Sequence, residues 1–254
     1  MRIGTYNMLC FEGWELAASK ADLGEMNDPR RVAYFAQVIK DLQCDVFCLQ
    51  EGTSVDYMKS IAALLNTNLA PFPSPTRFCG GVFTIYNILE ARYFSNCGPT
   101  GKSEPFSRFG GAALLDCEQA PLWIVNIHTN PHSEEMRQRE ADILAGHLKN
   151  LAATGYEIAV MGDFNSPVTG CVHDAVRRFG LINAKEACGG LEATFTDKQG
   201  LDKIAIDHIY LSAGLARRLR SAQVIKAPQF KLQGPMQPGM WINSDHLPVI
   251  IDLE

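Results

Sequence analysis

The sequence lacks the features that would divide the chain or place it in a membrane. No run of apolar residues approaches the roughly 20 that a membrane-spanning helix needs, although 46% of the 254 residues are hydrophobic. There is no linker rich in proline, glycine and serine, no internal repeat and no low-complexity tract. Since a β-rich domain of roughly 200–250 residues can form around one core, we expect residues 1–254 to form a single domain.

A basic stripe is also missing. The net charge is −5, and residues of both signs are spread along the chain. Proteins that bind long nucleic acids neutralise many phosphates with lysine and arginine, so this charge disfavours a long polymer as the partner. A bound cation or a few local arginines can offset an acidic total, and nucleic acid therefore stays open as an alternative.

The eight cysteines include no Cys-x-x-Cys pair and no regular spacing of the kind that a disulfide framework shows. Apolar runs surround several of them, and a free thiol there behaves as a small hydrophobic group. For Cys44 and Cys48 we expect packing in the core rather than metal binding. The pattern predicts a reducing cytoplasm, and the first predicted strand begins at Arg2, which leaves no room for a secretory leader. The cysteines are Cys10, Cys44, Cys48, Cys79, Cys97, Cys117, Cys171 and Cys188.

Helical and extended patterns alternate along the chain. Apolar residues at helical spacing, three times after a capping residue, predict helices from Pro29 to Leu42 after Asp28, Val55 to Leu65 after Ser54, Met136 to Leu151 after Ser133, and Val172 to Phe179 before Gly180. Short β-branched runs predict strands at Arg2–Asn7, Val46–Leu49, Leu122–Ile127, Ile158–Met161, Ile204–Leu211, Ala222–Ile225 and Val249–Leu253. Residues 71–110 are expected to be mostly strand and exposed loop. The alternation favours two layers of strands flanked by helices.

Acids, amides and imidazoles stand beside several of these strands. Polar groups that end apolar runs collect at one edge of a folded core, and carboxylates clustered there repel one another unless a cation is present. The pattern therefore indicates a divalent metal held against a phosphate. The residues concerned are Asn7, Glu51, Asp163, Asn165, Asp245 and His246.

The same residues lie in six motifs: Thr-Tyr-Asn7, Leu-Gln-Glu51, Asn-Ile-His128, Gly-Asp163-Phe-Asn165, Ile-Asp207-His-Ile and Ser-Asp245-His246. Their order resembles that of the endonuclease/exonuclease/phosphatase superfamily, which includes exonuclease III-like enzymes, deadenylases, sphingomyelinases and inositol phosphatases. The resemblance spans nearly the whole chain. It implies an α+β fold, a four-layer α/β/β/α sandwich of two mixed β-sheets, and a magnesium- or manganese-dependent phosphoester hydrolase.

Three residues carry the central chemistry of this interpretation. Glu51 is expected to be the principal metal ligand, since magnesium prefers carboxylate oxygens. Asp163 and Asn165 are two residues apart, so in an extended segment their side chains share one side. The resemblance implies that Asp163 orients and deprotonates the attacking water and that Asn165 donates hydrogen bonds to the phosphoryl oxygens.

The resemblance also implies roles for five polar residues near other strands. It pairs His246 with Asp207, and a carboxylate holds an imidazole in one tautomer and favours its charged form. We therefore expect His246 to contact the scissile phosphate. Asp245 would help to hold the metal or water, and His128 would stabilise the transition state. Asn7 is expected to orient Asp163 or a metal-bound water.

Substrate contacts are less specific in the sequence. Arg108 resembles a family arginine that precedes a strand near the site, and its guanidinium suits phosphate oxygens. Asn130, Arg137 and Arg139 follow His128 and are candidates for the pocket lining, with a capped, charged helix start as the equal alternative.

The chain departs from the family pattern in places. Leu9 stands where some exonuclease III-like members have an acid two residues after the asparagine, so the first strand offers no second carboxylate. The stretch from Gly80 to Tyr86 lacks the basic residue that ends this strand in many members. His208, next to Asp207, is expected to lie in a solvated turn without a functional role.

We therefore expect a cytoplasmic, monomeric hydrolase that uses Mg²⁺ or Mn²⁺ and acts on a small soluble or head-group phosphoester. An endonuclease or exonuclease on DNA or RNA is one alternative, and a non-catalytic relative that binds a phosphorylated ligand is another. A zinc hydrolase would need clustered histidine or cysteine ligands, whereas the present set consists mainly of carboxylates and amides.

Overall fold

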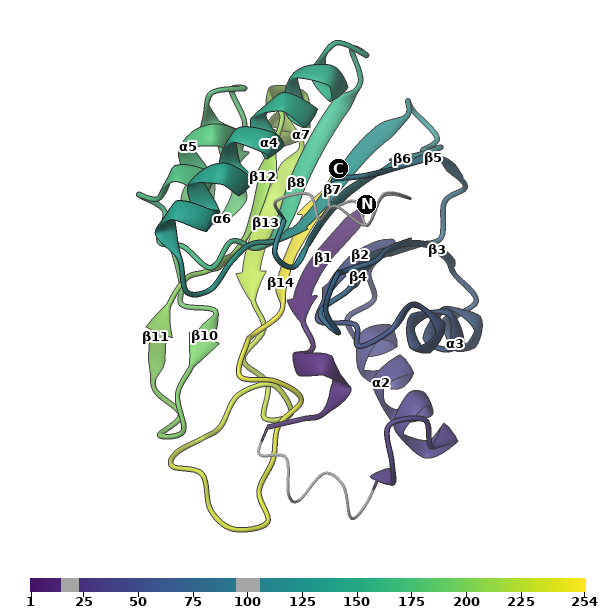
Figure 1. Ribbon diagram of the computed structural model, residues 1–254, viewed down its shortest axis with the longest axis vertical. Helices are drawn as coiled ribbons and strands as arrows, with labels where there is room; N and C mark the ends of the chain where they lie inside the picture. The colour runs from purple at the N-terminus through teal and green to yellow at the C-terminus, as the bar shows by residue number, and fades with distance from the viewer. Residues whose placement is uncertain (15–22, 95–105) are drawn as a thin grey trace.

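Two six-stranded sheets lie face to face in the computed structural model, which describes residues 1–14, 23–94 and 106–254 (Figure 1). Cys97 lies outside the described residues. The first sheet has the strand order β13 (Leu219–Val224), β14 (Val249–Leu253), β1 (Arg2–Asn7), β2 (Val46–Gln50), β4 (Gly80–Thr84), β3 (Asn68–Phe72). The second has the order β5 (Ile88–Tyr93), β6 (Phe109–Leu115), β7 (Leu122–His128), β8 (Glu157–Asp163), β12 (Asp207–Leu211), β9 (Ile182–Asn183).

Helices cover the outer faces of both sheets (Figure 1). On the first sheet these are α2 (Pro29–Asp41) and α3 (Val55–Leu65); on the second they are α4 (Glu134–Ala152) and α5 (Cys171–Arg177). The chain also forms the short helices η1 (Leu9–Phe11), α6 (Ala184–Ala187) and α7 (Ala213–Arg217), and a hairpin of β10 (Phe195–Thr196) and β11 (Asp202–Ile204). The predicted four-layer sandwich is confirmed.

The predicted helix caps are present. Side-chain oxygens of Asp28, Ser54 and Ser133 each accept a hydrogen bond from a backbone N–H in the first turn of α2, α3 and α4. This satisfies donors that have no partner inside the helix. The caps explain why these three starting points were predictable from sequence.

The predicted single strand Ile204–Leu211 is wrong, because the chain changes partners inside it. Ile204 ends β11, whose one partner among the described strands is β10, whereas Asp207 begins β12, which enters the second sheet between β8 and β9. At the change of direction, the Thr194 hydroxyl accepts hydrogen bonds from the backbone N–H groups of Ile206 and Asp207. A side chain distant in sequence thus replaces the ladder partners that one continuous strand would need.

The cysteines of the described residues are all free. Cys48 is buried in the core beneath the first sheet. Cys44 precedes β2 and packs against the same core, which agrees with the expected packing role.

A polar bridge crosses the otherwise apolar space between the sheets. Asn126 of β7 donates to the backbone oxygens of Leu49 and Gly81, both at 3.0 Å, and accepts a 2.7 Å hydrogen bond from Gln50 Nε2. Asn126 and Gln50 are fully buried. Because buried polar groups need partners, this bridge restricts how the two sheets can slide past each other.

Strand direction places the polar residues at one edge of the sandwich. The β1–β2 and β7–β8 pairs are parallel, so their carboxyl ends lie together. The antiparallel β12 starts at the same edge, where Asp207 is opposite Asp163. None of the helices in the described part of the chain has the length and apolar character that crossing a membrane requires.

We predict that Asn126→Leu lowers the free energy of unfolding by about 3 kcal/mol, because it leaves Leu49 O, Gly81 O and the Gln50 amide buried without their partner. Urea denaturation monitored by circular dichroism measures the change. The matched control is Asn68→Leu, since Asn68 is exposed and donates one hydrogen bond to Tyr86 O; we expect a loss below about 1 kcal/mol. Equal losses in both variants would contradict the bridging role.

Candidate functional site

Glu51 follows β2 directly and has a left-handed backbone conformation, with φ of +55°. Its side chain is 14% exposed. The carboxylate has weak partners: Oε1 accepts a 3.4 Å hydrogen bond from Asn7, and Oε2 accepts one of 3.7 Å from the Cys10 thiol. Burial raises the pKa of Glu51, and although His246 and Asn7 act against this, the net pKa stays above the ordinary value. The carboxylate has room for a stronger partner.

Asp163 ends β8 and is 1% exposed. Its Oδ2 accepts a 3.0 Å hydrogen bond from Asn7 Nδ2, and its Oδ1 accepts one of 2.8 Å from the backbone N–H of Asn165. Burial raises the pKa of Asp163 to about 7, with the nearby Asp207 adding to the effect and His246 opposing it. Asn7 thus contacts both Asp163 and Glu51, and its position agrees with the predicted orienting contact.

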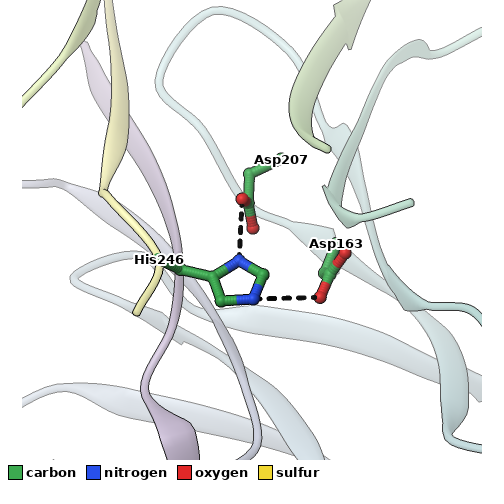
Figure 2. A group of neighbouring side chains, drawn as sticks. All are labelled: Asp163, Asp207 and His246. Atoms are coloured by element: carbon green, nitrogen blue, oxygen red, sulfur yellow. Dashed lines mark hydrogen bonds and ion pairs between the residues drawn. The ribbon is translucent and has the colours of Figure 1, made fainter. Parts of the chain in front are cut away.

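His246 lies between two aspartates (Figure 2). Its Nδ1 is 2.9 Å from Asp207 Oδ2, and its Nε2 is 3.8 Å from Asp163 Oδ2. Burial alone would lower the pKa of His246, but the attraction of Asp207 and Asp163 holds it well above the ordinary value. The imidazole is therefore positively charged near neutral pH, and Nδ1 donates to Asp207. The predicted His246–Asp207 pair is present.

The segment that carries His246 is tied to the β10–β11 hairpin. The Thr196 N–H donates to Asp245 O at 2.9 Å, and the Leu247 N–H donates to Thr194 O at 2.7 Å. The Phe195 ring lies edge-on to the His246 ring, with the ring centroids 5.4 Å apart. Asp245 itself is half-buried, and its charge contributes to the raised pKa of both Glu51 and His246.

His128 ends β7 and is almost fully buried, at 2% exposure. Its Nε2 is 3.5 Å from Asp163 Oδ2 and 3.9 Å from Glu51 Oε1, while Nδ1 has no hydrogen-bond partner within the described residues. Burial, together with the nearby Arg108 and His246 charges, holds the pKa of His128 well below the ordinary value. A neutral imidazole beside two carboxylates is available as a hydrogen-bond donor.

Asn165 does not lie in the extended segment that the sequence predicts. Its φ of +43° places it in the left-handed region, and its backbone N–H closes a tight turn onto the Asp163 carboxylate. Its Nδ2 donates to Thr129 O at 3.1 Å. The turn propensity of aspartate and asparagine prevails over strand continuation, yet Asp163 and Asn165 still line the same pocket.

The pocket at this edge has a volume of about 390 Å³. One side is polar and contains five of the predicted residues. The other side is apolar and comes from the hairpin, the segment after it and the β7–α4 connection; sequence reasoning missed it, although alternating isoleucines just before Asp207 were a visible signal. The lining residues are Glu51, His128, Asp163, Asn165, His246, Pro131, Phe195, Ile204 and Ile206.

The residues predicted to contact the substrate have different surroundings in the structure. The Arg108 guanidinium lies 4.0 Å from the centre of the Phe78 ring, and its Nε is buried without a hydrogen-bond partner within the described residues. Asn130 lies outside the pocket lining: its Oδ1 accepts from the N–H groups of His132 and Ser133, and its Nδ2 donates to Ser107. The Asn130 side chain therefore stabilises the start of α4.

The arginines of α4 have local partners. Arg137 donates to Asn130 O at 2.8 Å, and Arg139 pairs with Glu135 on the exposed side of the helix. These contacts match the alternative of a capped, charged helix start.

The expected solvated turn at His208 is wrong. His208 is fully buried on β12, where Nε2 donates to Ala205 O at 3.0 Å and Nδ1 accepts from Asn183 Nδ2 at 3.1 Å. Side chains of adjacent strand residues point to opposite faces, so Asp207 faces the site while His208 faces the helical layer.

The oxygen-rich donor set fits a hard divalent cation. Atoms of Asp163, Asp207 and His246 lie within 4.8 Å of one another, but the hydrogen bond from His246 already occupies Asp207 Oδ2, which makes this trio a hydrogen-bonded chain rather than a ligand shell. Glu51 has only weak partners and adjoins the charge of Asp245. Glu51 is therefore the better ligand candidate on chemical grounds.

Comparison with known proteins assigns the chain to a family. The family model described as the Endonuclease/Exonuclease/phosphatase family matches residues 4–246. No curated protein matches the sequence. A solved mannosyl-6-phosphatase from Bacteroides thetaiotaomicron is similar with a TM-score of 0.77 and 18% identity, covering 100% of this chain and 99% of that one.

Two further solved structures share the fold. The 3′ phosphatase NExo from Neisseria, bound to a product DNA hairpin, has a TM-score of 0.72 and 16% identity. An AP endonuclease from Archaeoglobus fulgidus has a TM-score of 0.71 and 13% identity. Each covers 100% of this chain and 99% of its own. With the family match across nearly its whole length, the chain belongs to the Endonuclease/Exonuclease/phosphatase family, whose members are generally phosphoester hydrolases.

Proposed function

We propose that the protein is a divalent-metal-dependent phosphoester hydrolase in which water attacks phosphorus directly. The observation that carries the proposal is the convergence of Glu51, His128, Asp163 and His246 on one pocket at the edge where the strands end. A buried site with two carboxylates, a charged imidazole and a neutral one has the groups needed to activate water and to stabilise a phosphoryl group.

Magnesium, or manganese in its place, is the proposed cofactor, with Glu51 and Asp245 as its ligands. The weak partners of Glu51 and its raised pKa support this, because a cation there would offset the burial of the carboxylate. A bound divalent cation supplies charge neutralisation at the phosphate oxygens.

Asp163 is the proposed general base. Two hydrogen bonds, from Asn7 and from the Asn165 backbone, hold its carboxylate in one orientation, and a pKa of about 7 suits proton transfer near neutral pH. Asn165 and His128 donate to charge that develops on the phosphoryl oxygens. His246, kept charged by Asp207, contacts the scissile phosphate.

A small soluble or head-group phosphoester is the proposed substrate. Among the described residues that line the pocket there is neither lysine nor arginine, whereas a polymer site needs many phosphate contacts. The apolar side formed by Phe195, Ile204 and Ile206 can pack against the organic group of a small ester. Arg108 is the proposed outer phosphate contact, supported by its unpartnered Nε. Asn130 acts by holding the neighbouring turn.

We place the protein in the cytoplasm and expect a monomer. Free cysteines throughout the described residues support a reducing compartment.

We predict that removal of divalent cations abolishes hydrolysis of p-nitrophenyl phosphate and bis-p-nitrophenyl phosphate, and that added Mg²⁺ or Mn²⁺ restores it. Release of p-nitrophenolate after exhaustive dialysis against chelator measures this. Zinc serves as the control cation, since the carboxylate- and amide-rich set does not favour it. Activity that survives exhaustive chelation would rule out the proposed mechanism.

The same enzyme preparations test which class of substrate the protein hydrolyses. We expect faster turnover of small phosphoesters than of plasmid DNA or RNA, and weak DNA binding with a shallow salt dependence, because each neutralised phosphate on duplex DNA would contribute a slope of roughly −0.9. Efficient plasmid nicking with a steep salt slope would instead identify a nuclease. A panel without any hydrolysis, together with tight binding of a phosphorylated ligand, would identify the non-catalytic alternative.

We predict that Asp163→Asn and His246→Ala each lower kcat by at least about 100-fold, because the first removes the base and the second a charged phosphate contact. Steady-state kinetics at saturating metal measure the loss. Asp174→Asn and His132→Ala change the same residue types at exposed positions and should retain kcat within about twofold. A site variant with unchanged kcat would remove that residue from the proposed machinery.

A further inference from the structure

The loop between β8 and α5 begins after Asp163 and carries Asn165 of the proposed site in an unusual backbone conformation. Asn165 has a φ of +43°, a conformation that asparagine tolerates better than most residues but that still costs free energy unless surrounding contacts stabilise it. Phe164, between Asp163 and Asn165, is fully buried. The contacts of this loop therefore decide where the Asn165 amide points.

On the pocket side, Thr129 holds the loop. Its backbone N–H donates to Asp163 O at 3.1 Å, and its hydroxyl donates to Phe164 O at 2.5 Å. Its carbonyl in turn accepts the Asn165 side-chain amide at 3.1 Å. These bonds restrain residues 163–165 from one side.

On the opposite side, His173 of α5 holds the loop. Its Nε2 lies 3.1 Å from Ser166 O, and its Nδ1 lies 2.7 Å from the Tyr210 hydroxyl. A carbonyl oxygen can only accept, so Nε2 carries the proton and Nδ1 accepts from Tyr210. Burial lowers the pKa of His173 to about 4, which keeps this neutral tautomer near pH 7.

The Phe164 ring fixes the same geometry by packing. It stacks on His173 with centroids 4.8 Å apart and planes 25° apart, and it meets His208 edge-on at 5.5 Å. One turn further along α5, Arg177 donates to Val168 O at 2.5 Å. Two side chains of one short helix thus bind two carbonyls of the loop, those of Ser166 and Val168.

We propose that His173 is a positioning residue for the site: its hydrogen bond to Ser166 O and its stacking on Phe164 keep Asn165 in the left-handed conformation that aims the amide into the pocket. The proposal rests on the function proposed above. In this arrangement α5, which contributes no residue to the pocket lining, sets the orientation of the Asn165 amide toward the phosphoryl group.

Three substitutions of His173 distinguish the effect of its hydrogen bond to Ser166 O from that of its hydrogen bond to Tyr210. A glutamine amide reaches the place of the imidazole Nε2, so His173→Gln retains a donor for Ser166 O. His173→Asn places its amide near Nδ1 and retains only the Tyr210 contact, and His173→Leu retains neither. Tyr210→Phe is the matched control, because it removes the other partner of the same ring and leaves the Ser166 bond intact.

We predict that His173→Leu and His173→Asn lower kcat by about 10-fold or more, with KM changed by less than about twofold, because misalignment of a contact made in the transition state lowers turnover rather than binding. His173→Gln and Tyr210→Phe should stay within about threefold of wild type. Kinetics run well below each variant's melting temperature, with p-nitrophenyl phosphate and Mg²⁺, measure this. Equal kcat losses in the glutamine and leucine variants, or no loss in any variant, would overturn the proposal.

Crystal structures of His173→Leu and His173→Gln supply a readout that does not depend on activity. We expect Asn165 to leave the left-handed region in the leucine variant and to keep it in the glutamine variant. An unchanged Asn165 conformation in His173→Leu would refute the positioning role. If the wild-type protein hydrolyses no phosphoester, the proposed function fails while these structures still decide what holds the loop.

Discussion

The ion pair between one protonated imidazole and two buried aspartates is the interaction on which the edge that carries the candidate site depends. His246 belongs to the segment that leads into the first sheet, whereas Asp163 and Asp207 belong to the second. A buried carboxylate without a partner costs several kcal/mol, so these strand ends are stable together and unstable apart. The contact joins the two sheets at the position where the pocket opens.

A second contact between the sheets is neutral and lies deeper. Asn126 joins β7 to β2 and β4 through three hydrogen bonds inside an apolar core. Hydrophobic burial is non-directional, and such polar contacts define the relative placement of two flat faces that could otherwise slide. With the sheets held in the core and at the edge, the pocket residues occupy fixed positions before any substrate binds.

Local signals in the sequence predicted much of this architecture. Capping residues and apolar periodicity located α2, α3 and α4, and polar residues beside strands located the edge that carries the candidate site. Errors arose where a distant group competes with local preference. The Thr194 hydroxyl divides the predicted strand Ile204–Leu211, and Asn183 of β9 binds a buried histidine, His208, that the sequence predicted to be in solvent.

Residue type and order along the chain were sufficient to identify the family, the fold class and the candidate site, because covalent order and strand direction bring the polar ends of the strands together. The apolar side of the pocket, the left-handed turn at Asn165 and the support from His173 arise only on folding. Each of them depends on contacts between segments far apart in sequence or on a backbone conformation that those contacts stabilise, and local propensity contains no information about such partners.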